Sequence, residues 1–499
     1  MLLKKALFHG NITKKIFSLF CVVAITFFYV RNAYSLSIEE EKALGQKFVS
    51  QIYRYFDLVN DEFCVKYIND LGQYLIRGLP SRPFPFHFYI VKDKSLNAFA
   101  APGGYVFVFS GLINAADRVD ELASVMCHEC GHVSARHISK RIEQGKRLGM
   151  MSLASLLLGI LIGGDAGNAL INSSMAASMQ AQLRYSRNDE RQADQIGFTL
   201  LGKSGFDAHA TVEIMKKLEN GALFSTNKIP PYLLTHPTGP ERVAYLQAML
   251  SHYVQPSPSK EVKHFRAMFP FFKTIVIAKS LDPDDAIKYF ERQQIHEDKK
   301  FLSCLGIGIA YMRLANYTAA IKNLKQARKL NPDAIPILTT LSEAYEYYGQ
   351  NLKALKLLQY AHTLDDEDDS VTFLLGKAYE NMGEYEKAIR LFERLASFKP
   401  VNNDVYYNLG ICYGRSKKLA LAHYNFGLYF MNIYDTKKAK FHFKRAKILA
   451  KNNPTLQEKI KEQQDIIKGK KPEPRHHHEW NEQKNKRQGI APSFTIGML

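Results

Sequence analysis

The N-terminal part of the chain mixes helical and extended hydrophobic patterns. Ser37 and Glu40 form a capping-box pattern that predicts the start of a helix, and two helices are expected before about Gly78. The apolar runs at residues 86–91 and 105–109 each predict a strand. We therefore expect two helices followed by a small sheet.

The next segment, residues 119–138, has a clear helical pattern. Leu122, Val125 and Met126 lie three or four positions apart and form an apolar stripe. This stripe predicts a helix that is buried beneath the sheet, and the mixture of helices and strands predicts an α+β domain.

A period of 34 residues runs through the C-terminal half of the chain. This is the tetratricopeptide pattern, in which helix pairs stack into a superhelix with a concave groove. The first unit, from about Ala267, is degenerate, and the residues around Phe443 predict one extra helix that pairs out of register. We expect the groove to bind a partner rather than to be purely structural. The residues that keep the period are Ala286, Ala320, Ala354, Ala388 and Ala422, with Tyr311, Tyr345, Tyr379 and Tyr413.

Two apolar segments raise the question of membrane contact. Residues 1–35 have the composition of a secretory signal: lysines precede an apolar run of 15 residues at Ile16–Val30, and Ala33–Ser35 is a small-x-small cleavage site. An uncleaved anchor is the alternative. Residues 150–164 are strongly apolar, and small residues and methionines follow to about residue 179. A buried helix, a surface helix in lipid and a lid over a cleft all fit; we expect a membrane-adjacent or shielding helix.

These patterns divide the chain into five parts. The C-terminal tail is polar and basic, lacks core periodicity and contains the single tryptophan, so we expect it to be disordered. The predicted parts are a signal peptide at 1–35, the α+β domain at 36–250, a linker at 251–266, the repeat domain at 267–450 and the tail at 451–499.

The net charge limits which partners are expected, and the number of cysteines argues against a complete disulfide framework. The formal net charge of +19 favours anionic partners such as membrane surfaces or lipopolysaccharide; nucleic acid is not expected, because no binding motif accompanies the charge. Of the six cysteines Cys21 lies in the leader, which leaves an odd number for a disulfide framework. Cys127 and Cys130 have no second C-x-x-C partner, so we expect buried packing residues rather than a thiolate metal site.

The helix at 119–138 carries the pattern H-E-x-x-H at His128, Glu129 and His132. Residues four apart share one helix face, so both imidazoles can point at one metal ion while Glu129 reaches a water on it. The alternative is a buried helix with two core histidines. His137, five residues after His132, faces another way, and we expect it to be structural or to support the site.

Glu190 and Asp194 are candidates for the third metal ligand and for a carboxylate that supports a ligand histidine. A catalytic zinc ion usually has three protein ligands and one open position, and Glu190 would be the third ligand. Asp194 would accept the far N–H of a ligand histidine and so fix its tautomer. The alternative is a solvated acidic face balanced by Arg187 and Arg191, but the presence of both motifs in this order favours a metal site.

The two motifs together resemble the gluzincin pattern, and the chain resembles most closely the HtpX and CAAX-prenyl-protease family of zinc metallopeptidases. Residues 97–112 are similar to the strand before that family's metal helix, and Thr235–Pro237 with Arg242 is similar to a motif after its third ligand. With its signal and repeats, the chain looks like those members of the family that act in β-barrel assembly in Gram-negative bacteria. The similarity covers roughly residues 37–454.

The resemblance implies one zinc ion per subunit, held by His128, His132 and Glu190, with Glu129 as the general base. It also implies a substrate strand at the sheet edge, which would bind an extended peptide through main-chain hydrogen bonds; an ordinary hairpin is the alternative. The residues of this expected strand are Tyr105, Val106, Phe107, Val108 and Phe109.

His236 lies in a proline-rich loop that is not expected to be helical. The resemblance implies that this histidine occupies the open zinc position and keeps the enzyme latent until it is displaced. Once off the metal, His236 is also expected to take a catalytic part by adding a hydrogen bond to the oxyanion. A surface histidine in a turn is the alternative.

The expected function is that of a periplasmic zinc endopeptidase in the quality control of outer-membrane β-barrel proteins. The resemblance implies stalled or misfolded outer-membrane proteins as clients, the β-barrel assembly machinery as partner, and chaperone activity beside proteolysis. Contact with a membrane surface is also expected. Two alternatives remain: a repeat scaffold or chaperone with a vestigial protease, and a protease associated with the inner membrane.

Overall fold

The computed structural model describes residues 36–79, 81–144, 186–224, 231–236, 240–294, 299–397 and 403–468. The chain divides into two compact units between Ala378 and Tyr379, and each is described by itself. The expected signal at 1–35 and the apolar segment at 150–179 lie outside the described residues. Within the described ranges, no helix is long and apolar enough to cross a membrane.

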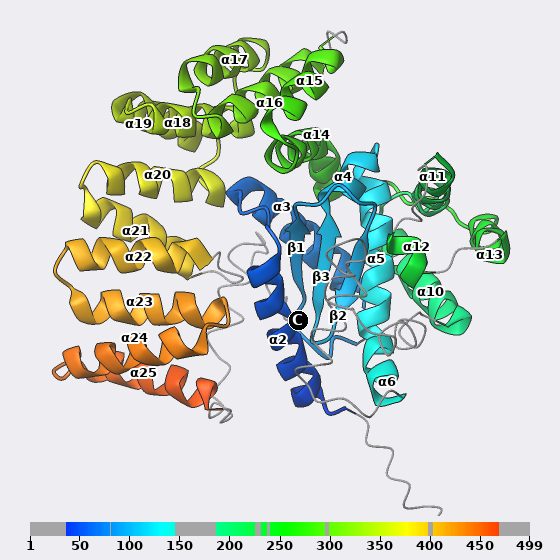
Figure 1. Cartoon of the computed structure of the whole chain (residues 1–499), viewed down its shortest axis with the longest axis horizontal. Coiled ribbons are helices and arrows are strands. Elements are labelled where there is room, and N and C mark those ends of the chain that lie inside the picture. The colour runs from blue at the N-terminus through cyan, green and yellow to red at the C-terminus, as the bar shows by residue number, and fades with distance from the viewer. Residues whose placement is uncertain are drawn as a thin grey trace, which may run out of the picture. The chain divides into compact units, whose positions relative to one another are not determined.

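A three-stranded sheet lies at the centre of the α+β part (Figure 1). Its strands are β1 (His87–Val91), β2 (Ala98–Ala101) and β3 (Tyr105–Phe109), in the order β1-β3-β2. Strand β3 pairs with β1 in parallel and with β2 antiparallel. The strand expected at the edge is therefore central, and the prediction that it lies open to substrate is wrong.

Strand β3 is not at the edge because β2 pairs with it on the side expected to be open. The sequence pattern does not predict β2. Its four residues, Ala-Phe-Ala-Ala, are mostly small and show no alternation. A tight turn at Gly103 and Gly104, both with positive φ, folds β2 back onto β3. The sheet edge on this side is therefore β2.

Helices surround this sheet. Helix α2 (Ile38–Tyr55) begins at the predicted capping box of Ser37 and Glu40. Helix α5 (Val119–Ser134) lies against β2 and β3, and the predicted helix ends four residues early because Arg136 adopts a left-handed conformation with φ of 54°. The neighbouring helices are α3 (Glu62–Leu75), the 3₁₀ helix η1 (Ile76–Gly78), α4 (Ser110–Ala115) and α6 (His137–Gln144).

Four further helices complete the α+β part. They are α10 (Arg187–Lys203), α11 (Ala210–Phe224), α12 (Pro231–Thr235) and α13 (Pro240–Leu250). Helix α12 corrects the expectation of a non-helical loop: Pro231 takes the first helical position, where the missing N–H of proline costs nothing.

The expected linker is partly helical. Helix α14 (Lys260–Ser280) begins inside it and packs against α3, α4 and α5. The hydroxyl of Tyr67 donates to the carbonyl of Phe265 at 2.8 Å, and the Tyr67 ring stacks on Phe272. Arg266 forms an ion pair of 2.6 Å with Asp120. Residues 260–266 therefore belong to a helix fixed on the α+β part.

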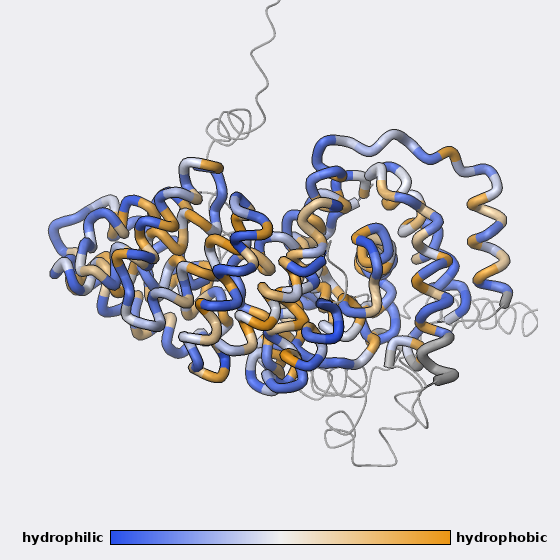
Figure 2. Tube along the Cα trace, turned by 90° about the horizontal axis from the view of Figure 1, so that it is seen from above, coloured by the Kyte–Doolittle hydropathy of each residue, from blue (hydrophilic) through white to orange (hydrophobic). Residues whose placement is uncertain are grey.

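The repeat region is all helical, which confirms the tetratricopeptide prediction. Ala286, Ala320, Ala354 and Ala388 are completely buried, and a Cβ on Gly308 would lie 2.5 Å from the side chain of Leu324. Figure 2 shows hydrophobic and hydrophilic positions alternating along these helices. They are α15 (Pro283–Gln293), α16 (Lys300–Arg313), α17 (Tyr317–Leu330), α18 (Ile335–Tyr347), α19 (Asn351–Leu364), α20 (Asp369–Asn381), α21 (Tyr385–Ala396), α22 (Asn403–Arg415) and α23 (Leu419–Asn432).

Two more helices follow these repeats. Helix α24 (Thr436–Leu449) packs on α23, as expected for the extra helix. Helix α25 (Pro454–Ile467) was not expected: its Leu456 and Ile460 are buried against α24. The prediction of disorder is therefore wrong for residues 454–467, a single polar helix in which only Leu456 and Ile460 are buried.

Candidate metal centre

Helices α5 and α10 carry the predicted site residues. The first turn of α5 holds Asp120 and Glu121, whose charges favour a helix N-terminus. Helix α10 begins at a capping box in which the hydroxyl of Ser186 accepts the N–H of Asp189 and the Asp189 side chain accepts the N–H of Ser186. Glu190 therefore lies in the first turn of α10, and Asp194 lies one turn later.

Two glycines let these helices approach closely. A Cβ atom on Gly131 would lie 2.9 Å from the carbonyl oxygen of Ala193, and one on Gly197 would lie 3.0 Å from the backbone of His128. No side chain fits at either position, so the helices meet backbone to backbone. This contact brings Glu190 to the histidines of α5.

Three predicted ligands converge in the interior. The Nε2 atoms of His128 and His132 are 3.0 Å apart. Glu190 places one carboxylate oxygen 3.4 Å from the Nε2 of His128 and the other 3.5 Å from that of His132. All three side chains are buried. The structure thus brings the predicted donors together in water-excluded surroundings.

The Nδ1 atoms of His128 and His132 also have hydrogen-bond partners. The Nδ1 of His128 lies 2.9 Å from Asp194, and the Nδ1 of His132 lies 2.9 Å from the Nδ1 of His137. The Nε2 of His137 faces Gln192 at 2.9 Å and Asp189 at 3.7 Å, so His137 donates there and accepts at Nδ1. Both histidines of α5 therefore carry their proton on Nδ1.

This protonation pattern leaves two Nε2 lone pairs and a carboxylate pointing at one another. Such a set is repulsive unless a cation lies among them. The residues present therefore fit a metal ion. The predicted role of Asp194 agrees with its position, and His137, expected to be structural or supporting, contacts a ligand histidine directly.

The pKa shifts of His128 and His132 also indicate that a positive charge is favoured between these side chains. Burial and Arg242 act to lower the pKa of His128, but Asp194 and Glu190 outweigh them and raise it to about 9. Burial holds the pKa of His132 well below its usual value. Without a metal, one proton held on His128 would balance the carboxylates.

Arg242 of α13 fixes both carboxylates. It forms two hydrogen bonds of 2.7 Å with Asp194 and an ion pair of 2.6 Å with Glu190. Burial acts to raise the pKa of Glu190, but its interactions with His236 and with the Arg242 guanidinium hold it well below its usual value. The sequence singled out Arg242 only as part of a motif; its ion pairs follow from the fold.

Glu129 lies beside the ligands and is completely buried. The backbone N–H of Ala100, on edge strand β2, donates to its Oε2 at 3.0 Å. Its Oε1 has no hydrogen-bond partner among the described residues. Burial raises the pKa of the Glu129 carboxyl.

His236 follows α12 and joins the same cluster. Its ring stacks on Tyr232 with centroids 4.5 Å apart, and its Nδ1 lies 3.0 Å from Glu190 and 3.4 Å from the Nε2 of His128. One ligand atom from each of His128, His132, Glu190 and His236 fits within 4.8 Å of the others. His236 is buried, so it is not the surface histidine of the alternative.

Cys127 and Cys130 take no part in this cluster. Both thiols are buried and unpaired with each other, and burial raises the pKa of each. This fits the expectation of packing residues.

Comparison with known proteins agrees with this geometry. Residues 42–250 match the model of peptidase family M48, and residues 302–334 and 347–409 match tetratricopeptide-repeat models. Residues 42–250 are a peptidase family M48 domain. In this M48 domain, the metal cluster, Glu129 and Arg242 all lie within the matched residues.

Several named proteins are similar in sequence to part of this chain. A Vibrio cholerae protein named beta-barrel assembly-enhancing protease is 32% identical over 314 residues, which cover 62% of this chain and 64% of that protein. The Escherichia coli beta-barrel assembly-enhancing protease is 35% identical over 213 residues, 42% of this chain and 44% of that protein. Mitochondrial metalloendopeptidase OMA1 of Schizosaccharomyces pombe is 26% identical over 226 residues, 44% of this chain and 64% of that protein. The matches thus span less than two thirds of each relative.

Among solved structures, the crystal structure of MamA matches 32% of this chain and 91% of its own, at 25% identity and a TM-score of 0.27.

Proposed function

We propose that the M48 domain of this chain is a zinc endopeptidase, with His128, His132 and Glu190 as the metal ligands. The observation that carries this proposal is the meeting of two imidazole lone pairs with a carboxylate, while Asp194 and His137 hold the opposite nitrogens. A set of nitrogen and carboxylate donors with one further position suits zinc. The family match supports the reaction class.

Bound zinc would lower the pKa of a water molecule toward about 7 and polarise the scissile carbonyl. Glu129 is placed to act as the general base. The Ala100 N–H holds its Oε2, so Oε1 takes the proton from the attacking water and passes it to the leaving amine. The raised pKa of Glu129 favours the protonated form that this second transfer needs.

The corrected strand order moves the proposed substrate site from β3 to β2. Strand β2 is the sheet edge, and its Ala100 contacts the general base. A peptide added in extended form along this edge would pass the carboxylate of Glu129. We propose β2 as the substrate strand.

We also propose that His236 keeps the centre latent. Its Nδ1 lies close to the proposed ligand atoms, so it would compete with water for the position that a catalytic zinc ion usually leaves open. Substrate would enter only after α12 moves and takes His236 off the cluster. The stacking of His236 on Tyr232 gives this closed state a contact that must be broken first.

The biological role rests on the named relatives. We propose that the chain acts in the periplasm on stalled or misfolded outer-membrane β-barrel proteins, together with the β-barrel assembly machinery. The supporting observation is the name and similarity of the Vibrio and Escherichia proteins. The tetratricopeptide repeats would bind these clients, which also allows chaperone activity without cleavage.

The proposed activity is tested with the variant Glu129→Gln. It removes the base but none of the donors, so the purified protein should retain one zinc ion per chain and lose proteolysis of casein. Arg187→Gln, an exposed side chain on α10, is the control and should keep both. Cleavage by Glu129→Gln, or a wild-type protein without bound zinc after reconstitution, would leave the repeat scaffold as the better explanation.

A further inference from the structure

Among the helices of the second unit that the structure describes, α24 has the largest excess of positive charge. The 14 residues of α24 include six lysines and arginines and no acidic residue: Lys437, Lys438, Lys440, Lys444, Arg445 and Lys447. Its neighbours differ, because α23 has no charged residue and α25 balances its two lysines with three acidic residues. The excess therefore belongs to α24 itself and not to the surrounding surface.

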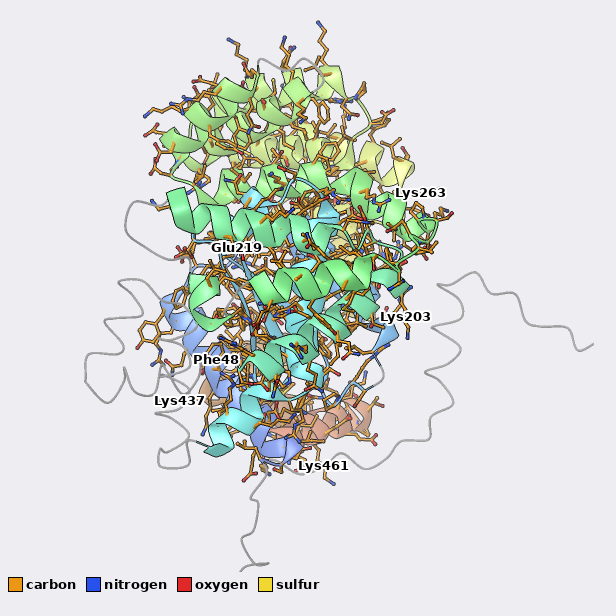
Figure 3. The ribbon with its side chains drawn as sticks, turned by 90° about the vertical axis from the view of Figure 1, so that its right-hand side faces the viewer. Phe48, Lys203, Glu219, Lys263, Lys437 and Lys461 are labelled. Atoms are coloured by element: carbon orange, nitrogen blue, oxygen red, sulfur yellow. The ribbon has the colours of Figure 1, made fainter. Side chains whose placement is uncertain are left out.

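The basic residues of α24 share a face with apolar ones. Lys437, Phe441, Lys444 and Ile448 lie three or four positions apart and so form one stripe along the helix. Phe441 is 57% exposed and Ile448 is 48% exposed. Lys437, which is labelled in Figure 3, is exposed. A purely solvated face would not place large apolar side chains among the lysines.

The opposite face of α24 packs against α23 and α25. Ala439, Phe443 and Ala446 are completely buried against α23 and α25, and a Cβ on Gly427 of α23 would lie 2.6 Å from the ring of Phe443. The exposed stripe is therefore held outward by the packing beneath it.

Internal ion pairs do not neutralise this stripe. Lys438, on the flank, pairs with Asp435 and lies over the ring of Phe430. Among the described residues, Lys440, Lys444 and Lys447 form no ion pair, and each is exposed. Their charges are available to an external anion.

We propose that this face of α24 docks on the surface of an anionic phospholipid bilayer. Phe441 and Ile448 would enter the boundary between headgroups and acyl chains, and the lysines would extend along them to reach lipid phosphates. An acidic protein would satisfy the lysines but not the exposed aromatic and aliphatic side chains between them. With 14 residues, α24 lies on the bilayer and does not cross it. The inference is independent of the proposed protease activity.

The experiment measures co-sedimentation with vesicles of phosphatidylcholine alone and of phosphatidylcholine with phosphatidylglycerol. The protein carries Glu129→Gln, so proteolysis plays no part, and lacks residues 1–35, because their apolar run would insert by itself. One variant combines Lys440→Glu, Lys444→Glu and Lys447→Glu. A second combines Phe441→Ser and Ile448→Ser.

Helix α17 offers a matched control. It is also basic without acidic residues, and Lys322, Lys325 and Lys329 are exposed on one face, where Leu330 is the neighbouring exposed apolar side chain and no aromatic side chain lies among the lysines. The control variant changes these three lysines to glutamate. All variants alter exposed side chains only, and their thermal unfolding should match the parent protein.

We expect the parent to bind vesicles that contain phosphatidylglycerol and to bind phosphatidylcholine weakly. The α24 charge variant should lose at least about tenfold in partitioning, and the apolar variant should lose several-fold, while the α17 control stays within about twofold of the parent. Equal losses in the α24 and α17 charge variants would mean a general charge effect and would overturn the proposal. An unchanged apolar variant would do the same and would favour an acidic protein partner.

Discussion

Gly197 of α10 packs directly on the backbone of His128 in α5: a Cβ at position 197 would lie 3.0 Å from both the N and the Cα of His128. Glu190 and Asp194 precede Gly197 on the same helix. The distance between α10 and α5 at Gly197 therefore determines how close the two carboxylates lie to the histidines of α5. This glycine therefore limits how closely the proposed ligands on α10 approach those on α5, although it offers no side-chain ligand atom of its own.

The variant Gly197→Ala should move the helices apart. We expect a loss of about 1–3 kcal/mol in the free energy of unfolding, because a methyl group enters a contact between backbones. Affinity for zinc should fall with it, measured by competition with a chelator. Gly414→Ala is the control, since a Cβ there would meet only the Ala422 side chain at 3.8 Å. Unchanged zinc affinity in Gly197→Ala would show that the helix distance does not limit the site.

His137 should act through His132 rather than on substrate. In His137→Phe the acceptor for the Nδ1 proton of His132 is lost, and we expect zinc affinity to fall about 10–100-fold. His137→Gln keeps an acceptor atom and should recover part of the loss. The readouts are the chelator midpoint and, at saturating zinc, the KM for a peptide, which should not change. Equal losses in both variants would indicate a packing role only.

The variant His236→Ala should relieve latency. Three proposed ligands remain, so we expect zinc content to be unchanged and the rate of casein degradation to rise several-fold. His209→Ala is the matched control, because that side chain is exposed and, within the described part of the chain, forms its hydrogen bond with Asp207. A lower rate in His236→Ala would mean that this histidine assists the reaction and does not block it.

Glu343 predicts a dependence of stability on pH. It lies beside Lys279, which pairs with Asp61 at 2.6 Å, and burial raises the pKa of Glu343 above 4.5 although Lys279 opposes this. A group whose pKa is higher in the fold adds stability below its unfolded value and loses it as the pH rises through the folded value. We therefore expect Glu343→Gln to be more stable than the parent at pH 7.5.

The same difference should disappear near pH 4, where the carboxyl of the parent is protonated in both states. Urea midpoints at the two pH values measure it. Glu241→Gln serves as the control, because its side chain is 79% exposed. A variant that is less stable than the parent at pH 7.5 would show that the ionised carboxylate is well compensated by Lys279.

The parts that sequence could predict are those with strong local patterns. The H-E-x-x-H helix, the E-x-x-x-D helix and the 34-residue repeats carry their spacing in one segment each, and the structure forms helices at all of them. The order of the strands depends on pairing between segments, and the short strand at Ala98–Ala101 has no alternating pattern to reveal it.

Contacts between distant segments were equally hidden. The closeness of Gly131 to Ala193 and the hydrogen bond from Ala100 to Glu129 depend on how α5, α10 and β2 pack. The contact of His132 with His137 is local, but it depends on the break between α5 and α6 at Arg136. Sequence gives the residue types at these positions but not their distances. For the same reason, the predicted linker at 251–266 is helical from residue 260 on, and its aromatic and charged side chains pack on α3 and α5.

The donors on α5 and α10 are separated by about sixty residues of chain. An ion shared by His132 and Glu190 would act as a reversible crosslink that closes this long loop, much as a disulfide does, and would restrict the unfolded chain if it stayed bound. Loading with zinc would then do more than prepare a hydrolytic centre. Bound zinc would also stabilise the packing of α10 on α5. A chelator would therefore lower the free energy of unfolding of the M48 domain as well as stop the reaction.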